Sequence, residues 1–110
     1  MADRPIRVQL SRAKGWRMPP NTVSVARPGP WGNPFIVGRD GTRARCVELY
    51  RYLLTGLICL TKEPSPDEQR TALKYAIKNI RKLRGKNLGC WCRLDGKPCH
   101  ADVLLEVANG

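Results

Sequence analysis

The sequence predicts a small single-domain α/β sandwich with a mostly parallel sheet, spanning residues 1–110. Strand-like segments are separated by helical ones, and strands joined in this way form a parallel sheet through right-handed helical crossovers. A chain of 110 residues suits one hydrophobic core and is too short for two. Its 42% hydrophobic and 26% charged residues are ordinary for a globular protein, which excludes a chain that is disordered throughout.

Two strands are predicted near the N-terminus. Over residues 6–10 apolar residues alternate with polar ones, the pattern of a half-buried strand. Glycine and two prolines break all periodicity over residues 13–21, which we expect to form a loop. Residues 22–26 then resume the β pattern with threonine and valines.

A loop is predicted at residues 27–35, whose sequence is Arg-Pro-Gly-Pro-Trp-Gly-Asn-Pro-Phe. Its prolines and glycines exclude a helix or a sheet interior, while its aromatic residues are too apolar for an idle solvent loop. It is either a rigid connector held to the core by its aromatic rings or a binding loop. In the second case Arg27 and Asn33 would donate hydrogen bonds to a ligand beside Trp31.

Two amphipathic helices are predicted in the middle of the chain. Thr42 is the expected N-cap of a helix over residues 43–55, where apolar residues recur at helical spacing. Ser65, followed by a proline and then a glutamate that completes a capping box, begins a second helix over residues 66–83. Cys46 falls on the apolar stripe of the first helix, so we interpret it as a core residue.

The remaining elements are short. Residues 57–61 are either a strand or an apolar turn, and the pattern does not decide between them. Gly85 is the expected left-handed residue after the second helix. An interior strand follows at residues 88–92, and a closing helix is predicted over residues 100–108.

The charge balance points to an anionic partner. Twenty Lys and Arg residues against nine Asp and Glu residues give a net charge of +11. Such an excess favours nucleic acid or a phosphorylated nucleotide as partner, because neutralised phosphates release condensed counterions. The second helix carries a basic stripe, which is either a nucleic-acid surface or a solvated face. The stripe consists of Lys74, Lys78, Arg81 and Lys82.

The sequence also indicates a cytoplasmic location without membrane association. No apolar segment approaches the roughly 20 residues needed to span a bilayer, and the N-terminus lacks an apolar signal core. Five cysteines are an odd number, and three of them lie close together in the sequence. This pattern favours reduced thiols, metal binding or thiol reactivity over a disulfide framework.

The segment from residue 86 to residue 105 carries a candidate zinc site. Cys90 and Cys92 share a face if the strand stays regular, because side chains alternate with period two. The following loop can return Cys99 and His100 to the same strand end, which gives the Cys3His set that suits tetrahedral zinc. The single residue between the first two cysteines and the adjacency of the last two ligands are unusual for such a site.

Two other interpretations use the same residues. Cys99 and His100 lie at the start of the closing helix, where amide groups and the helix dipole stabilise a thiolate or an anionic ligand. Cys99 could then be a catalytic nucleophile, with His100 or Asp102 assisting proton transfer. Alternatively Cys90 and Cys92 are buried strand residues, and His100 and Asp102 only cap the helix.

Three motifs follow one another along the chain: the loop at 27–35, Arg-Gly-Lys-Asn-Leu-Gly-Cys-Trp-Cys at 84–92 and Cys-His-Ala-Asp-Val-Leu at 99–104. Together they resemble a domain-of-unknown-function family of bacteriophages and bacteria. The resemblance spans nearly the whole chain and implies a Rossmann-like three-layer sandwich with one shared site. Ala101 stands where family members usually carry glycine, which matters only if the backbone must approach a ligand closely.

These observations together predict one cleft. Ligands of open parallel sheets bind beyond the carboxyl ends of the strands, and both motif-bearing segments follow strands. The predicted lining is Arg27, Trp31, Asn33, Cys90, Cys92, Cys99, His100 and Asp102.

Three functions fit this cleft, and whether the protein is an enzyme stays open. The first is a phage accessory protein directed at a nucleotide or nucleic acid in the host-cell cytoplasm. The second is a non-enzymatic, zinc-stabilised module that binds nucleic acid or a host protein. The third is a thiol redox or sulfur-handling protein that uses Cys90 and Cys92.

Overall fold

The computed structural model describes residues 5–26, 29–92 and 94–109, and it confirms the α/β fold class. Arg27, predicted to contact a ligand, lies outside the described residues. The described elements, in chain order, are β1 (Arg7–Gln9), β2 (Thr22–Ser24), α1 (Arg43–Leu54), α2 (Pro66–Asn79), the 3-10 helix η1 (Ile80–Leu83), β3 (Asn87–Cys90) and α3 (His100–Asn109).

The three described strands form one parallel sheet in the order β1-β3-β2, as predicted for β2 and β3. The central strand β3 aligns Gly89 with Val8 of β1 on one side and Leu88 with Val23 of β2 on the other. A side chain at position 89 would meet Leu10, because an ideal Cβ there lies 2.8 Å from the leucine Cδ2 atom. The side chain of Leu10, the residue after β1, thus packs over the backbone at Gly89.

The strand predicted over residues 88–92 is two residues too long at its C-terminal end. The last ladder bonds run from the Leu10 amide to the Cys90 carbonyl and from the Val25 amide to the Gly89 carbonyl, both at 2.8 Å. Beyond them the chain bends, so Trp91 is 46% exposed instead of packed within the sheet. Cys92 therefore lies outside the strand.

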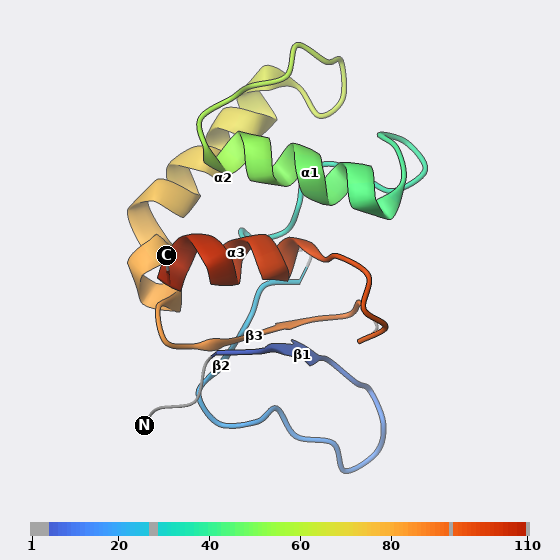
Figure 1. Cartoon of the computed structure of the whole chain (residues 1–110), viewed down its shortest axis with the longest axis vertical. Coiled ribbons are helices and arrows are strands. Elements are labelled where there is room, and N and C mark those ends of the chain that lie inside the picture. The colour runs from blue at the N-terminus through green and yellow to red at the C-terminus, as the bar shows by residue number, and fades with distance from the viewer. Residues whose placement is uncertain (1–4, 27–28, 93, 110) are drawn as a thin grey trace.

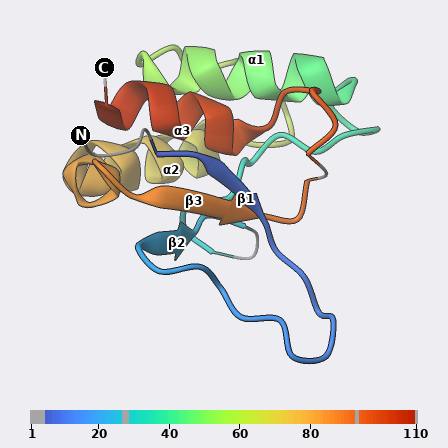
Figure 2. The same ribbon diagram turned by 60° about the horizontal axis from the view of Figure 1, so that its bottom comes forward.

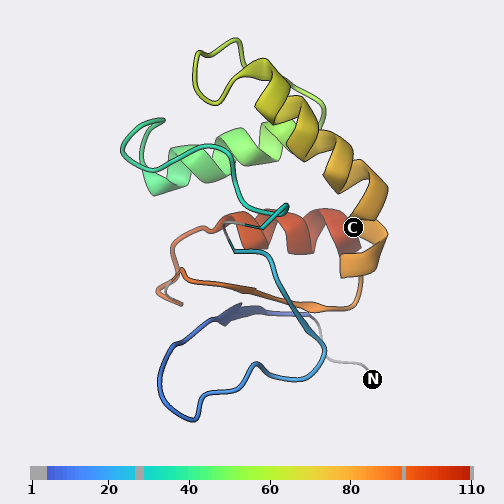
Figure 3. The same cartoon turned by 180° about the vertical axis from the view of Figure 1, so that it is seen from behind.

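All three helices lie on one side of the sheet (Figures 1 and 3), with α3 against β3 and β1 and with α1 beyond α3. The connection from β1 to β2 extends on the opposite side of the sheet from the helices (Figure 2). Sheet, α3 and α1 are thus successive layers. Helices on both faces of the sheet, as in a Rossmann fold, are not seen in the described part of the chain.

The helix caps follow the sequence prediction. The hydroxyl of Thr42 accepts a hydrogen bond from the Arg45 amide, and the hydroxyl of Ser65 accepts one from the Glu68 amide, each at 3.2 Å. The second helix was predicted to reach residue 83, but its α-helical part ends at Asn79 and continues as η1. Asn79 donates its side-chain amide to the Tyr75 carbonyl where the backbone tightens.

Residues 57–61, whose structure the sequence left open, form a loop that α2 holds in place. Gln69 is fully buried, and its side-chain oxygen accepts from the Cys59 amide at 2.8 Å. Its nitrogen donates to the carbonyls of Cys59 at 2.9 Å and Pro64 at 3.0 Å. The Gln69 side chain thus forms hydrogen bonds with backbone groups that a neighbouring strand would otherwise satisfy.

Aliphatic side chains from the sheet and the helices form a large part of the core. Leu88 of β3, Leu53 of α1, Leu83 of η1 and Leu104 of α3 are each at most 1% exposed. Cys46 is also buried, which confirms its assignment to the core. No described helix combines the length and apolar character needed to cross a bilayer.

Candidate metal centre

Three cysteine sulfurs meet at the carboxyl-terminal edge of the sheet. Cys90 ends β3, Cys92 follows the bend, and Cys99 immediately precedes α3. Their Sγ atoms all lie within 4.8 Å of one another, and those of Cys90 and Cys99 are 3.1 Å apart. Cys90 and Cys99 are buried, and Cys92 is half-buried. The fold therefore brings together the three cysteines that the sequence singled out.

The loop between Cys92 and Cys99 is held by a residue that the sequence analysis did not select. Arg43, the first residue of α1, donates from Nε to the Pro98 carbonyl at 2.7 Å. Its Nη1 atom forms an ion pair with Asp95 at 3.3 Å. This arginine attaches the returning loop to α1, and so places Cys99 next to the end of β3.

Asp102 fixes the backbone at the start of α3. One of its carboxylate oxygens accepts from the Cys99 amide at 2.9 Å and from Nη1 of Arg7 at 3.1 Å. The Arg7 side chain is only 9% exposed. Because Arg7 belongs to β1, its ion pair with Asp102 connects the start of α3 to that strand. The carboxylate thus acts as a helix cap and as the partner of a buried cation. Its predicted catalytic role stays a prediction.

The imidazole of His100 has a defined orientation. Its Nε2 atom lies 2.7 Å from the Val25 carbonyl, which can only accept, so Nε2 carries the proton. The other nitrogen, Nδ1, is 3.7 Å from the sulfur of Cys99. His100 therefore approaches the cluster at the sulfur of Cys99. Among the described residues, the three cysteine sulfurs are the possible metal ligands that all lie within 4.8 Å of one another, and no fourth ligand atom belongs to this group.

The three thiols have different acidities. The hydrogen bond from Cys90 is the main cause that lowers the pKa of Cys99, against the opposing effect of burial. The hydrogen bond with Cys99 and burial raise the pKa of Cys90, and burial raises that of Cys92. Cys99 is accordingly the thiolate of the cluster near neutral pH, and the other two sulfurs carry protons that a bound metal would displace.

A family model described as Domain of unknown function (DUF4326) matches residues 8–110. The chain belongs to this family. The match includes the whole cysteine cluster, and it confirms the domain-of-unknown-function family suggested by the sequence motifs. No curated protein matches the chain significantly, and no solved structure does so either.

Two small hollows in this DUF4326 domain open onto the cluster. The first, of about 60 Å³, is lined by Asn33, Phe35, Val37, Arg43, Cys46, Val47, Cys92, Cys99 and His100. The second, of about 130 Å³, is lined by Ala26, Cys90, Trp91, Cys92 and His100. Pockets that bind small molecules measure about 300–1,000 Å³, so each hollow is small by comparison. A ligand of nucleotide size would have to lie on the surface outside them.

The described part of the 27–35 loop is packed into the DUF4326 core. Trp31 is 6% exposed, its ring contacts Tyr75 edge-on at 5.0 Å, and its carbonyl accepts from the Tyr50 hydroxyl. Asn33 donates to the Cys46 carbonyl and accepts from the Phe35 amide, both at 2.9 Å. These contacts are those of a rigid connector. The ligand-binding roles of Trp31 and Asn33 stay predictions.

The basic stripe lies elsewhere on the DUF4326 domain. Its residues, Lys74, Lys78, Arg81 and Lys82, belong to α2 and η1, and none of them lines either hollow at the cluster. The stripe is therefore separate from the two hollows at the cysteines.

Proposed function

We propose that this domain binds one zinc ion through the thiolates of Cys90, Cys92 and Cys99. The observation that supports the proposal is the approach of the three sulfurs to within 4.8 Å of one another. In a tetrahedral site with Zn–S bonds of about 2.3 Å, two sulfurs lie about 3.8 Å apart. In the cluster one sulfur pair is 3.1 Å apart and no pair is more than 4.8 Å apart, so small side-chain rotations would fit the ion. Soft thiolate ligands also select zinc over the hard cations.

We further propose that His100 supplies the fourth ligand through Nδ1. Zn–N bonds of about 2.0 Å and Zn–S bonds of about 2.3 Å place a nitrogen about 3.5 Å from a sulfur in a tetrahedral site. The Nδ1 atom is 3.7 Å from the Cys99 sulfur, and Nε2–H is already bonded to the Val25 carbonyl. Zinc-binding histidines commonly donate the second nitrogen in this way, which fixes the tautomer.

Cobalt(II) titration tests the metal site, because its absorption spectrum reports thiolate ligands and tetrahedral geometry. We expect one cobalt per chain, with strong thiolate-to-metal charge transfer, and displacement of cobalt by zinc. The substitution Cys99→Ser is expected to weaken binding by more than about 100-fold, the upper range for outer-shell residues. Cys59→Ser is the control, since Cys59 is a half-buried cysteine that lies outside the cluster.

Equal cobalt affinity of the Cys99→Ser and Cys59→Ser variants would exclude the site. His100→Ala should keep the charge-transfer band but change the ligand-field bands, and an unaltered spectrum would remove His100 from the ligand set. Rapid alkylation of Cys92 in metal-treated protein would favour the alternative thiol redox role, because a zinc-bound thiolate is protected from such reagents.

We also propose that the sheet edge next to the metal binds single-stranded nucleic acid. Trp91 is 46% exposed, and the guanidinium carbon of Arg12 lies 5.0 Å from the centre of its ring. An exposed aromatic ring beside a cation is a stacking platform for nucleobases, and the net charge of +11 favours phosphate contacts. The metal would hold the bend that presents Trp91.

The substitution Trp91→Ala is expected to weaken binding of a fluorescent single-stranded oligonucleotide about tenfold, which corresponds to the loss of one stacked base. Fluorescence anisotropy at several salt concentrations measures this effect, and affinity should fall steeply with salt. Leu94→Ala is the control, because Leu94 is 59% exposed and lies in the same segment. If both variants bind like wild type, Trp91 does not contact the nucleic acid.

The sequence-based hypotheses of catalysis by Cys99, His100 and Asp102 and of thiol redox activity at Cys90 and Cys92 stay predictions. The same holds for a bacteriophage accessory role, for a host-protein partner and for a location in the host-cell cytoplasm. The metal proposal bears on the first two hypotheses directly, since a thiolate bound to zinc is a weaker nucleophile than a free one.

A further inference from the structure

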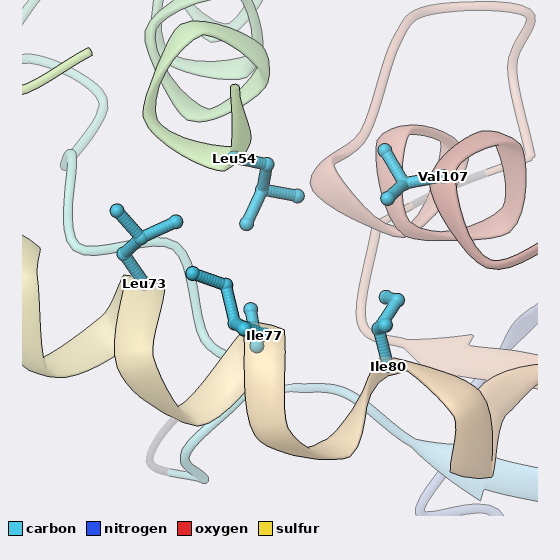
Figure 4. A pocket seen from close by; sticks show the side chains of 6 residues that line it. Leu54, Leu73, Ile77, Ile80 and Val107 are labelled. Atoms are coloured by element: carbon cyan, nitrogen blue, oxygen red, sulfur yellow. The ribbon is translucent and has the colours of Figure 1, made fainter. Parts of the chain in front are cut away.

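An apolar hollow lies between the three helices, on a part of the molecule that the metal centre does not use (Figure 4). It measures about 80 Å³, and its lining is Leu54 of α1, Leu73, Ala76 and Ile77 of α2, Ile80 of η1 and Val107 of α3. Figure 4 shows the labelled side chains converging on one space from α1, from the continuous α2–η1 segment and from α3. None of these side chains carries a polar group.

The hollow is open, and apolar residues at its edge remain in contact with solvent. Ile77 is 69% exposed and Val107 is 45% exposed. Single exposed apolar side chains are ordinary on protein surfaces. Here, however, two of them border the same apolar depression, so a partner could bury both together with the hollow.

The charges around Ile77 have one sign. Lys74 and Arg81 lie three residues before and four residues after Ile77, and so occupy the same side of the helical segment, with Lys78 beside them. In the described part of the chain no ion pair involves any of these three cations. Beside Val107, Glu106 is already paired with Arg51. The edge formed by α2 therefore presents unneutralised positive charge.

We propose that this surface docks an acidic amphipathic helix of another protein. An apolar side chain of the partner would enter the hollow beside Ile77 and Val107, and carboxylates flanking it would pair with Lys74 and Arg81. This is the helix-in-groove mode of recognition, in which spaced apolar anchors fill a groove. The positive charge of the α2 edge favours a negatively charged partner, and the hollow favours a partner with an apolar side chain that can fill it.

Two other occupants fit the same surface less well. A symmetric dimer would place the same basic edge of each copy against the other, and like charges across an interface are unfavourable. Nucleic acid would neutralise Lys74 and Arg81 but offers the hollow and Ile77 no apolar partner. The combination of an apolar hollow and a cationic edge is complementary to an amphipathic acidic segment.

A designed peptide of about 18 residues, or roughly five helical turns, tests the proposal. It carries leucines at positions three and four residues apart and glutamates on both flanks, and a matched peptide has lysines in place of the glutamates. We expect the acidic peptide to bind in a fluorescence anisotropy assay and the lysine peptide to bind at least tenfold more weakly. Ile77→Ser should weaken binding of the acidic peptide about tenfold.

The fold should survive these changes, because Ile77 is 69% exposed. Circular dichroism verifies this point. Leu57→Ser is the matched control, since Leu57 is 60% exposed but does not line the hollow. This variant should bind the acidic peptide with the affinity of wild type. The double substitution Lys74→Glu with Arg81→Glu should reverse the preference between the two peptides.

Three results would overturn the proposal. The first is an acidic peptide that binds no better than the lysine peptide, and the second is an affinity that Ile77→Ser leaves unchanged. The third is a duplex oligonucleotide that displaces the acidic peptide and binds wild type and Ile77→Ser equally, which would assign the surface to nucleic acid. Because this surface is separate from the cysteines, Cys99→Ser should bind the peptide like wild type, so that failure of the metal proposal is distinguishable from failure of this one.

Discussion

Removal of zinc is expected to lower the midpoint of thermal unfolding by about 15 °C or more. A ligand present at 1,000 times its dissociation constant stabilises the folded state by about 4 kcal/mol. One kcal/mol corresponds to about 4–8 °C for domains slightly smaller than this one. The effect arises because the proposed ligands join the end of β3 to the start of α3, two elements that meet in the core.

Circular dichroism melting curves of the chelated and the zinc-restored protein measure this difference. The samples should contain a reductant, because the sulfurs of Cys90 and Cys99 are 3.1 Å apart and their oxidation would compete with metal binding. The Cys99→Ser variant should melt at the same temperature with and without zinc, whereas Cys59→Ser should respond like wild type. A wild-type midpoint that chelation does not move would show that the cysteines hold no structural metal.

The parts of the fold that the sequence predicted well depend on local interactions. Thr42 and Ser65 cap their helices through contacts three residues away, and Gly85 has the expected positive φ of 75°. Such contacts can be predicted from a few neighbouring residues of the sequence. The parallel pairing of β2 with β3 could also be predicted, because the segment between them contains two long helical patterns.

The errors arise where distant segments decide the local structure. Strand β3 ends at Cys90 because its neighbours leave the sheet after Leu10 and Val25, and no pattern within residues 88–92 indicates this. Arg43 was missed because its partners in the cysteine loop are more than 50 residues away. On an amphipathic helix such an arginine is indistinguishable from a solvated one.

The candidate site was predicted in part for the same reason. Clustering of Cys90, Cys92 and Cys99 follows from their sequence proximity and a returning loop, and the structure brings their sulfurs together. The sequence also offered helix capping as a role for His100 and Asp102. Asp102 does cap α3, whereas His100 instead donates to the carbonyl of Val25, 75 residues away. A contact of this range requires the folded sheet.

Replacement of Asp102 by alanine is expected to lower the free energy of unfolding by about 3 kcal/mol. Loss of a helix cap costs about 1 kcal/mol. Loss of one partner of a buried ion pair costs about 3–5 kcal/mol, a range that must be reduced here because the Asp102 side chain is 43% exposed although Arg7 is only 9% exposed. Asp102→Asn keeps an acceptor for the Cys99 amide, so its effect should be smaller.

Urea denaturation measures these differences, with Asp67→Ala as control. Asp67 also pairs with an arginine, Arg70, at 3.1 Å, but its side chain is 94% exposed, so its removal should hardly change stability. This comparison separates a structural carboxylate from a catalytic one, because a group that only transfers protons to a ligand leaves the stability of the free protein nearly unchanged when it is removed. If Asp102→Ala is as stable as Asp67→Ala, the carboxylate does not hold β1 and α3 together, and the catalytic interpretation gains support.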